Sequence, residues 1–167
     1  RPAYEAGIYQ TASQISLIFV VILNAMNTIF SPMIADLYSR KESVRMEELY
    51  RVSTKWGLYL VAPLYLVIMI FPQEFITSIF GAKYVSGYLP MMILVTTQVV
   101  NYGTEAVGYL LIMTGHQNNW FITSGLTMTL CIVLNAILVP NYGMLGAAIA
   151  TAIAISTLYI AGLGQVR

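Results

Sequence analysis

The stretch from Leu134 to Ala154 constrains the fold of this chain more than any other. A first apolar run reaches Val139 and is followed by Pro140, which has no N–H for a helical hydrogen bond. Asn141 to Gly143 then supply residues that favour a tight turn, and a second apolar run begins at once. The stretch therefore predicts a helical hairpin in which Pro140 ends the first helix.

The second run of this hairpin carries a face of small residues. Gly146, Ala150 and Ala154 recur at every fourth position, with other small side chains beside them. Small faces let two helix backbones approach closely in lipid, where packing rather than hydrophobicity drives helix association. The pattern favours a hairpin packed inside a membrane helix bundle.

The composition indicates a bilayer protein. Hydrophobic residues make up 58% of the chain, charged residues only 9%, and the mean hydropathy is +0.74. Soluble domains have about 25% charged residues. Because a span takes about 20 residues, a chain of this length has room for five. The lone Cys131 and the net charge of +1 indicate neither an intrachain disulfide nor a nucleic-acid partner.

Apolar runs and turn residues divide the chain into spans. We expect an all-α polytopic membrane helix bundle with five transmembrane helices at residues 6–35, 56–71, 89–114, 119–139 and 144–164. Pro32 is expected to bend or close the first of these spans, and Pro63 to kink the second. A short surface helix is expected at residues 74–80, closed by Gly81.

A charged segment separates the first two spans. Met46, Leu49 and Tyr50 recur there at helical intervals, and Ser39 and Glu42 have the spacing of a capping box. The segment predicts an amphipathic interfacial helix at residues 40–55 that runs into the second span.

Basic residues predict the orientation of the chain. The connection between the first two spans holds five of them, Arg40, Lys41, Arg45, Arg51 and Lys55. The connection between the second and third spans holds only Lys83, and the one between the fourth and fifth holds none. By the positive-inside bias, the first connection is cytoplasmic. We therefore expect the amino end outside and the carboxyl end in the cytoplasm.

Motifs in order along nearly the whole chain resemble those of one transporter family. They are GIYQTASQIS, FSPMIADLYSRKE, KWGLYLVAPLYLVI followed by IFGAKYV, YLLIMTGHQNNW, and LN-x-x-LVPNYG-x-x-GAAIAT. They resemble a polysaccharide flippase of the multidrug/oligosaccharidyl-lipid/polysaccharide exporter superfamily, which moves lipid-linked sugars for O-antigen or capsule assembly. The same orientation follows from this resemblance.

The resemblance implies a partial transporter in a prokaryotic plasma (inner) membrane. Residues 1–167 are expected to form part of the carboxyl-terminal lobe, with the amino-terminal lobe of the same chain missing. The implied partner is a lipid-diphosphate-linked oligosaccharide, and the implied mechanism is alternating access between two lobes.

The third span carries a polar stripe. Its members step by three or four residues and so share one helix face: Gln98, Asn101, Tyr102, Glu105 and Tyr109. A carboxylate at membrane depth costs about 2.5 to 3.5 kcal/mol on insertion scales, so Glu105 should face protein or water. One interpretation places the stripe in the transport cleft, with Glu105 as a proton or cation site or an acceptor for sugar hydroxyls. The other leaves Glu105 solvated near the interface or bonded to a neighbouring helix.

The first span has a looser polar face. It consists of Gln10, Gln14, Asn24 and Thr28. Asn24 is a candidate cleft residue, although such side chains more often tie membrane helices together by hydrogen bonds.

The basic residues Arg40, Lys41 and Arg45 also have two interpretations. They could gather anionic diphosphate headgroups at the cytoplasmic mouth, or they could serve only as the topology signal.

No enzymatic motif occurs, so we expect no catalytic residue, metal or cofactor. The one histidine, His116, lacks the partners of a metal site or a catalytic set. Two alternatives to a flippase stay open: a cation-coupled multidrug exporter of the same superfamily, and a non-transporting membrane scaffold subunit.

Overall fold

The predicted all-α fold is confirmed by the computed structural model. The structure describes residues 2–113 and 117–165, with side chains for residues 4–42, 44–102, 118 and 120–162. No strand occurs among these residues. The elements in order are α1 (Pro2–Ser39), α2 (Ser43–Ile70), α3 (Pro72–Phe80), the 3₁₀-helix η1 (Ala82–Gly87), α4 (Tyr88–Met113) and α5 (Gln117–Gln165).

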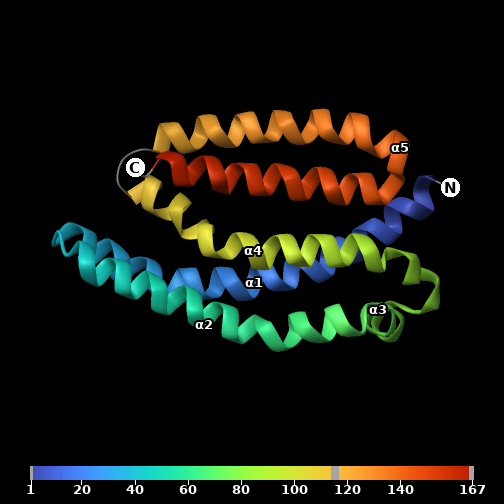
Figure 1. Ribbon diagram of the computed structural model, residues 1–167, viewed down its shortest axis with the longest axis horizontal. Helices are drawn as coiled ribbons and strands as arrows, with labels where there is room; N and C mark the ends of the chain where they lie inside the picture. Colours follow the sequence, from blue (N-terminus) through green and yellow to red (C-terminus); the bar gives the residue numbers. More distant parts are fainter. Residues whose placement is uncertain (1, 114–116, 166–167) are drawn as a thin grey trace.

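Three of the helices are long and apolar enough to cross a membrane, within the residues that the structure describes. They comprise Tyr4–Ser39, Val44–Ile70 and Trp120–Gly162. The third of these is a hairpin, because α5 doubles back on itself into two antiparallel arms (Figure 1). We refer to residues 117–142 as the first arm and to residues 144–165 as the second arm. The number of spans in a bilayer stays a prediction.

The reversal in α5 lies at Gly143 and not at Pro140. Gly143 has φ 56° and ψ −133°, whereas Pro140 lies inside the helical stretch. Proline removes one N–H from the helix, and in a membrane bundle neighbouring groups compensate for that loss. Of the two expectations for Pro32, that it closes the first span is likewise wrong, because α1 continues through it to Ser39. A bend at Pro32 stays a prediction. Pro63 also lies within an unbroken helix, α2.

The charged segment and the second span form one continuous helix, α2. The turn before it places Lys41 at φ 58°, and Glu42 precedes the first helical residue without a capping side-chain hydrogen bond. Ser39 Oγ donates instead to the Asp36 carbonyl at 2.7 Å. The capping-box interpretation is therefore wrong, because the Ser39 hydroxyl is engaged at the end of α1.

The predicted short helix is present as α3 and closes one end of the bundle. It ends at Phe80 and is capped by Gly81, whose φ of 94° suits glycine. Beyond it, the Tyr4 hydroxyl donates to the Lys83 carbonyl at 2.7 Å, and Gly87 lies against Ile8. These contacts attach the start of α1 to η1.

The main apolar core lies among α1, α2 and α4, with one residue from α3. Its buried members are Ala12, Ile15, Phe19, Leu23, Val61, Ile68, Ile76, Met91, Val95 and Tyr102. The α5 hairpin lies on the other side of α4, with its second arm nearer (Figure 1).

The small face of the second arm is buried. Gly146, Ala150 and Ala154 are all buried, and a Cβ on Gly146 would meet the backbone carbonyl of Leu138 in the first arm. The two arms thus approach closely at Gly146 and Leu138, next to the turn, as a small residue there predicts.

Candidate functional site

Asn101 lies between two helices rather than on an open face. Its side chain is 7% exposed, and Nδ2 donates to the Thr97 carbonyl at 2.8 Å within α4. The same nitrogen donates to Ser156 Oγ, on the second arm of α5, at 3.2 Å. This part of the polar stripe therefore connects α4 to the hairpin.

Tyr102 points to a different neighbour. It is 3% exposed, and its ring covers Gly57 of α2 so closely that a Cβ at Gly57 would overlap the ring. Successive helical residues point about 100° apart. Asn101 and Tyr102 therefore lie at the two edges of the polar stripe and contact different helices.

Among the described side chains, two predicted cleft residues contact different helices: Asn101 contacts α5 and Tyr102 contacts α2. Gln98 and Asn24 are half-buried, on α4 and α1 respectively. The side chains of Glu105 and Tyr109 lie outside those that the structure describes. Whether the whole stripe lines a cleft stays a prediction, and its described members contact at least two partner helices.

Asn27 is a buried polar residue that the sequence interpretation missed. It is 7% exposed, and Nδ2 has no hydrogen-bond partner among the described residues. The available signal was its spacing, because Asn27 follows the core residues Phe19 and Leu23 at intervals of four. A buried amide donor without a hydrogen-bond partner lowers the stability of the fold, so Asn27 is a destabilising residue within the bundle.

Two tyrosines also reach across helix interfaces. The Tyr65 hydroxyl of α2 lies 3.3 Å from Thr96 Oγ1 of α4. The Tyr9 hydroxyl of α1 lies 3.3 Å from Thr151 Oγ1 of the second arm. Neither pair is visible from sequence spacing, because the partners lie far apart in the chain. Such bonds position helices in lipid, where each contributes about 0.6 kcal/mol on average.

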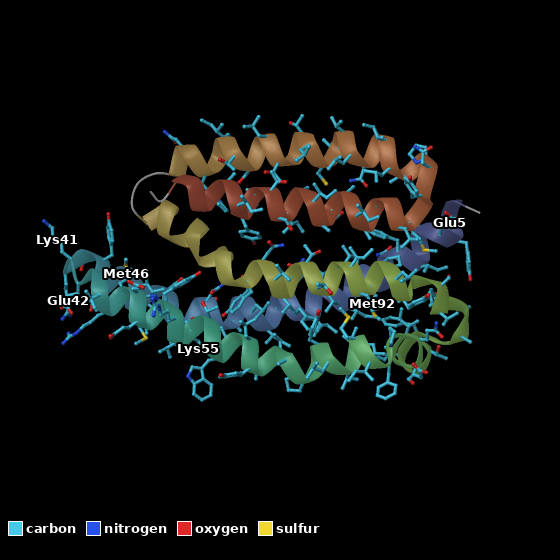
Figure 2. The ribbon with its side chains drawn as sticks, in the orientation of Figure 1. Glu5, Lys41, Glu42, Met46, Lys55 and Met92 are labelled. Carbon is cyan, nitrogen blue, oxygen red and sulfur yellow. The ribbon has the colours of Figure 1, made fainter. Side chains whose placement is uncertain are left out.

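The basic cluster is exposed and partly paired. Arg40 lies 3.1 Å from Asp36, and Arg45 lies 2.8 Å from Glu42, in both cases between side-chain nitrogen and carboxylate oxygen. Figure 2 shows Lys41 and Glu42 at the end of the bundle opposite Glu5. Exposed pairs of this kind contribute about 0 to 1 kcal/mol, so a phosphate could compete for either arginine.

No group of three or more His, Cys, Asp or Glu side chains that could hold a metal occurs in the described part of the chain. Cys131 is a half-buried free thiol, and the Asn135 amide donates to its carbonyl at 2.8 Å.

The fold and these contacts define the class of protein. Long apolar helices, with polar side chains meeting between them, are the features of a polytopic membrane helix-bundle protein.

Comparison with known proteins gives the family. The family described as "Polysaccharide biosynthesis protein" matches residues 2–88, more than half of the chain, and the chain belongs to this family. The resemblance to polysaccharide flippases is thereby confirmed.

Two curated relatives agree with this assignment. The "Probable low-salt glycan biosynthesis flippase Agl15" of Haloferax volcanii is 24% identical over 149 residues, which cover 89% of this chain and 32% of the relative. The "Capsular polysaccharide biosynthesis protein CapF" of Staphylococcus aureus is 22% identical over 146 residues, 87% of this chain and 37% of the relative. The chain thus spans about a third of each relative's length. No solved structure matches it significantly.

Proposed function

We propose that this chain is part of a membrane flippase that moves a lipid-linked oligosaccharide across a prokaryotic plasma membrane. The observation that carries the proposal is the family match over α1, α2 and α3, helices that include two of membrane-spanning length. A relative named as a glycan biosynthesis flippase supports the same class, a transporter rather than an enzyme.

The proposed mechanism is alternating access. Residues 1–167 form part of the carboxyl-terminal lobe, and a second lobe of the same protein faces it across a central cleft. The sugar headgroup crosses in the cleft while the lipid tail stays in the bilayer. The relatives are long enough for a second lobe, since the aligned stretch covers only 32% and 37% of them.

Within this mechanism, we assign the later part of the α4 stripe, Glu105 and Tyr109, to the cleft side of the lobe. Glu105 is the candidate proton or cation site, or an acceptor for sugar hydroxyls, with Tyr109 as a flat surface for a sugar ring. Carboxylates within membrane segments mark ion or substrate pathways more often than structure.

Rescue of surface polysaccharide in a flippase-deficient strain tests the function. The full-length protein should restore the polysaccharide. Glu105→Gln should reduce the rescue at unchanged membrane expression, and Glu48→Gln in the exposed start of α2 is the matched control. Failure of the unmodified protein, in strains supplied with several different oligosaccharide precursors, would contradict a flippase role. Unchanged rescue by Glu105→Gln would remove only that residue from the mechanism.

The basic cluster has a separate role in the proposal. Arg40, Lys41 and Arg45 recruit the diphosphate of the cargo at the cytoplasmic mouth. Replacing all three with glutamine should weaken transport even when the orientation in the membrane is unchanged. Normal transport in correctly oriented protein would assign the cluster to topology alone.

A second candidate function is a non-transporting membrane scaffold. It is favoured by the hydrogen bond from Asn101 to Ser156 and by the burial of Tyr102 against Gly57. A scaffold would be needed for polysaccharide export without moving the lipid-linked sugar itself, so purified protein in vesicles would show no translocation.

A third candidate, a cation-coupled drug exporter, is favoured by the acidic character of Glu105. Drug resistance conferred by the full protein, without rescue of polysaccharide, would support it.

A further inference from the structure

One face of α1 is polar and uncovered. Gln10, Gln14 and Thr28 are exposed, and Asn24 is half-buried. At 3.6 residues per turn, these four side chains fall within an arc of about 80°. We call these four residues the α1 seam.

The α1 seam lies on the side of the helix away from the core. Phe19, which is fully buried, points about 180° from Gln10 around the helix axis. No other helix of the described chain covers the exposed members of the seam. From Gln10 to Thr28 the seam extends about 27 Å along the axis, close to the ~30 Å thickness of a bilayer core.

The two glutamines have no hydrogen-bond partner among the described residues, whereas the Thr28 hydroxyl donates to the Asn24 carbonyl at 2.9 Å. An unpartnered amide facing lipid is unfavourable, because hydrocarbon offers it neither donor nor acceptor. Faces that meet lipid should be apolar. The first arm of α5 has that character, with exposed Phe121, Leu126, Met128, Ile132 and Ile137.

The side of α1 next to the seam carries exposed apolar residues instead of polar ones. Ile18 and Ile29 are 48% and 62% exposed, and they lie about 80° and 100° around the helix from Gln10. The same helix therefore has a lipid-compatible side and a water-compatible side.

We propose that the α1 seam lines a water-filled passage and hydrogen-bonds the sugar hydroxyls of the cargo. This inference rests on the proposed flippase function and deepens it. An amide both donates and accepts, as hydroxyls do, so the two groups pair in either direction. Residues 6–35 hold no charge, which matches an uncharged sugar rather than a diphosphate.

Two exposed apolar residues lie on the same face of α1 as the seam, between Gln14 and Asn24. Leu17 and Val21 are 53% and 68% exposed between the two polar ends. Apolar constrictions close membrane passages by excluding water. Leu17 and Val21 thus form the barrier that separates an outer vestibule at Gln10 and Gln14 from an inner one at Thr28.

Thiol labelling in the full-length protein tests this inference. Cys131 and any other native cysteine are replaced, and single cysteines are introduced at Gln10, Gln14 and Thr28, with matched controls at Ile18 and Ile29. A charged, water-soluble methanethiosulfonate is applied in membrane vesicles. Because a thiolate forms poorly in apolar surroundings, seam positions should react about tenfold faster than the controls. Val21→Cys should react more slowly than Gln14→Cys and Thr28→Cys.

Adding lipid-linked oligosaccharide should then slow the labelling at the seam. The inference would be overturned if the seam cysteines reacted no faster than the cysteines at Ile18 and Ile29. That result is expected if another protein segment covers the seam. The inference would also be overturned if adding the cargo did not slow the labelling. Translocation by the same cysteine-free protein is measured in parallel. Absent translocation contradicts the proposed function, whereas translocation with an unreactive seam contradicts only the inference.

Discussion

Asn101 on α4 and Ser156 on the second arm of α5 form a hydrogen bond of 3.2 Å, although 55 residues separate them in the chain. Ser156 points about 160° away from Ala154 around the axis of the second arm, so the bond and the buried Ala154 lie on different sides of that arm. The polar contact fixes the second arm against α4.

Replacing Ser156 with alanine should destabilise the bundle slightly. The change removes the acceptor on α5, but Asn101 keeps its bond to Thr97. We expect a loss of about 0.6 kcal/mol, and at most about 1.7 kcal/mol, in the free energy of unfolding. Unfolding by denaturing detergent in mixed micelles measures it. Thr157→Ala is the control, because that hydroxyl donates to the Ile153 carbonyl of its own helix. Equal effects of the two changes would contradict the interhelical role.

Adding a methyl group at Gly57 should separate α2 from α4. The new Cβ would overlap the Tyr102 ring, which is 3% exposed and has little room to move. Overpacking of this kind costs about 1 to 3 kcal/mol. Thermal unfolding of Gly57→Ala in detergent should show the loss, and the additional change Tyr102→Leu should recover part of it. No recovery in the double variant would mean that the two residues are not in contact.

Gly146→Ala should loosen the α5 hairpin. There the added Cβ meets the Leu138 backbone carbonyl, which cannot rotate away as a side chain can. We expect a loss of about 1 to 3 kcal/mol in the same unfolding measurement. Gly125→Ala in the first arm is the matched control, since nothing lies within 4 Å of its added Cβ. That control should be neutral or stabilising by up to about 1 kcal/mol, because alanine is the better helix former.

The two ends of the bundle should be labelled from opposite sides of the membrane. Lys41 and Glu5 lie at opposite ends (Figure 2), and both are exposed. From the positive-inside bias, a cysteine at Lys41 should react with an impermeant maleimide only in inside-out vesicles. A cysteine at Glu5 should react only in intact cells or right-side-out vesicles. The reverse pattern would overturn the predicted orientation.

The class of fold and the approximate positions of the main helices were predictable from the amino-acid sequence. Long apolar runs in a chain with few charges leave only membrane helices that satisfy their own backbone groups, and Gly143 with the small residues after it specified a hairpin. The family was also visible in the motifs, and the match over residues 2–88 confirms it. These properties are local, since they depend on neighbours within one helix or one turn.

The partner of each polar side chain, in contrast, depended on how the helices pack against one another. Helical spacing placed Gln98, Asn101 and Tyr102 on one stripe, but it did not show that Asn101 contacts α5 while Tyr102 contacts α2. It also did not show that Asn27 is buried, or that Gln10 and Gln14 stay uncovered. Periodicity gives the direction of a side chain from its own axis, whereas burial depends on which helices pack around that axis. The prediction that Pro140 ends a helix was wrong for a related reason. The loss of one backbone hydrogen bond costs little stability when packing holds the rest of the helix in place.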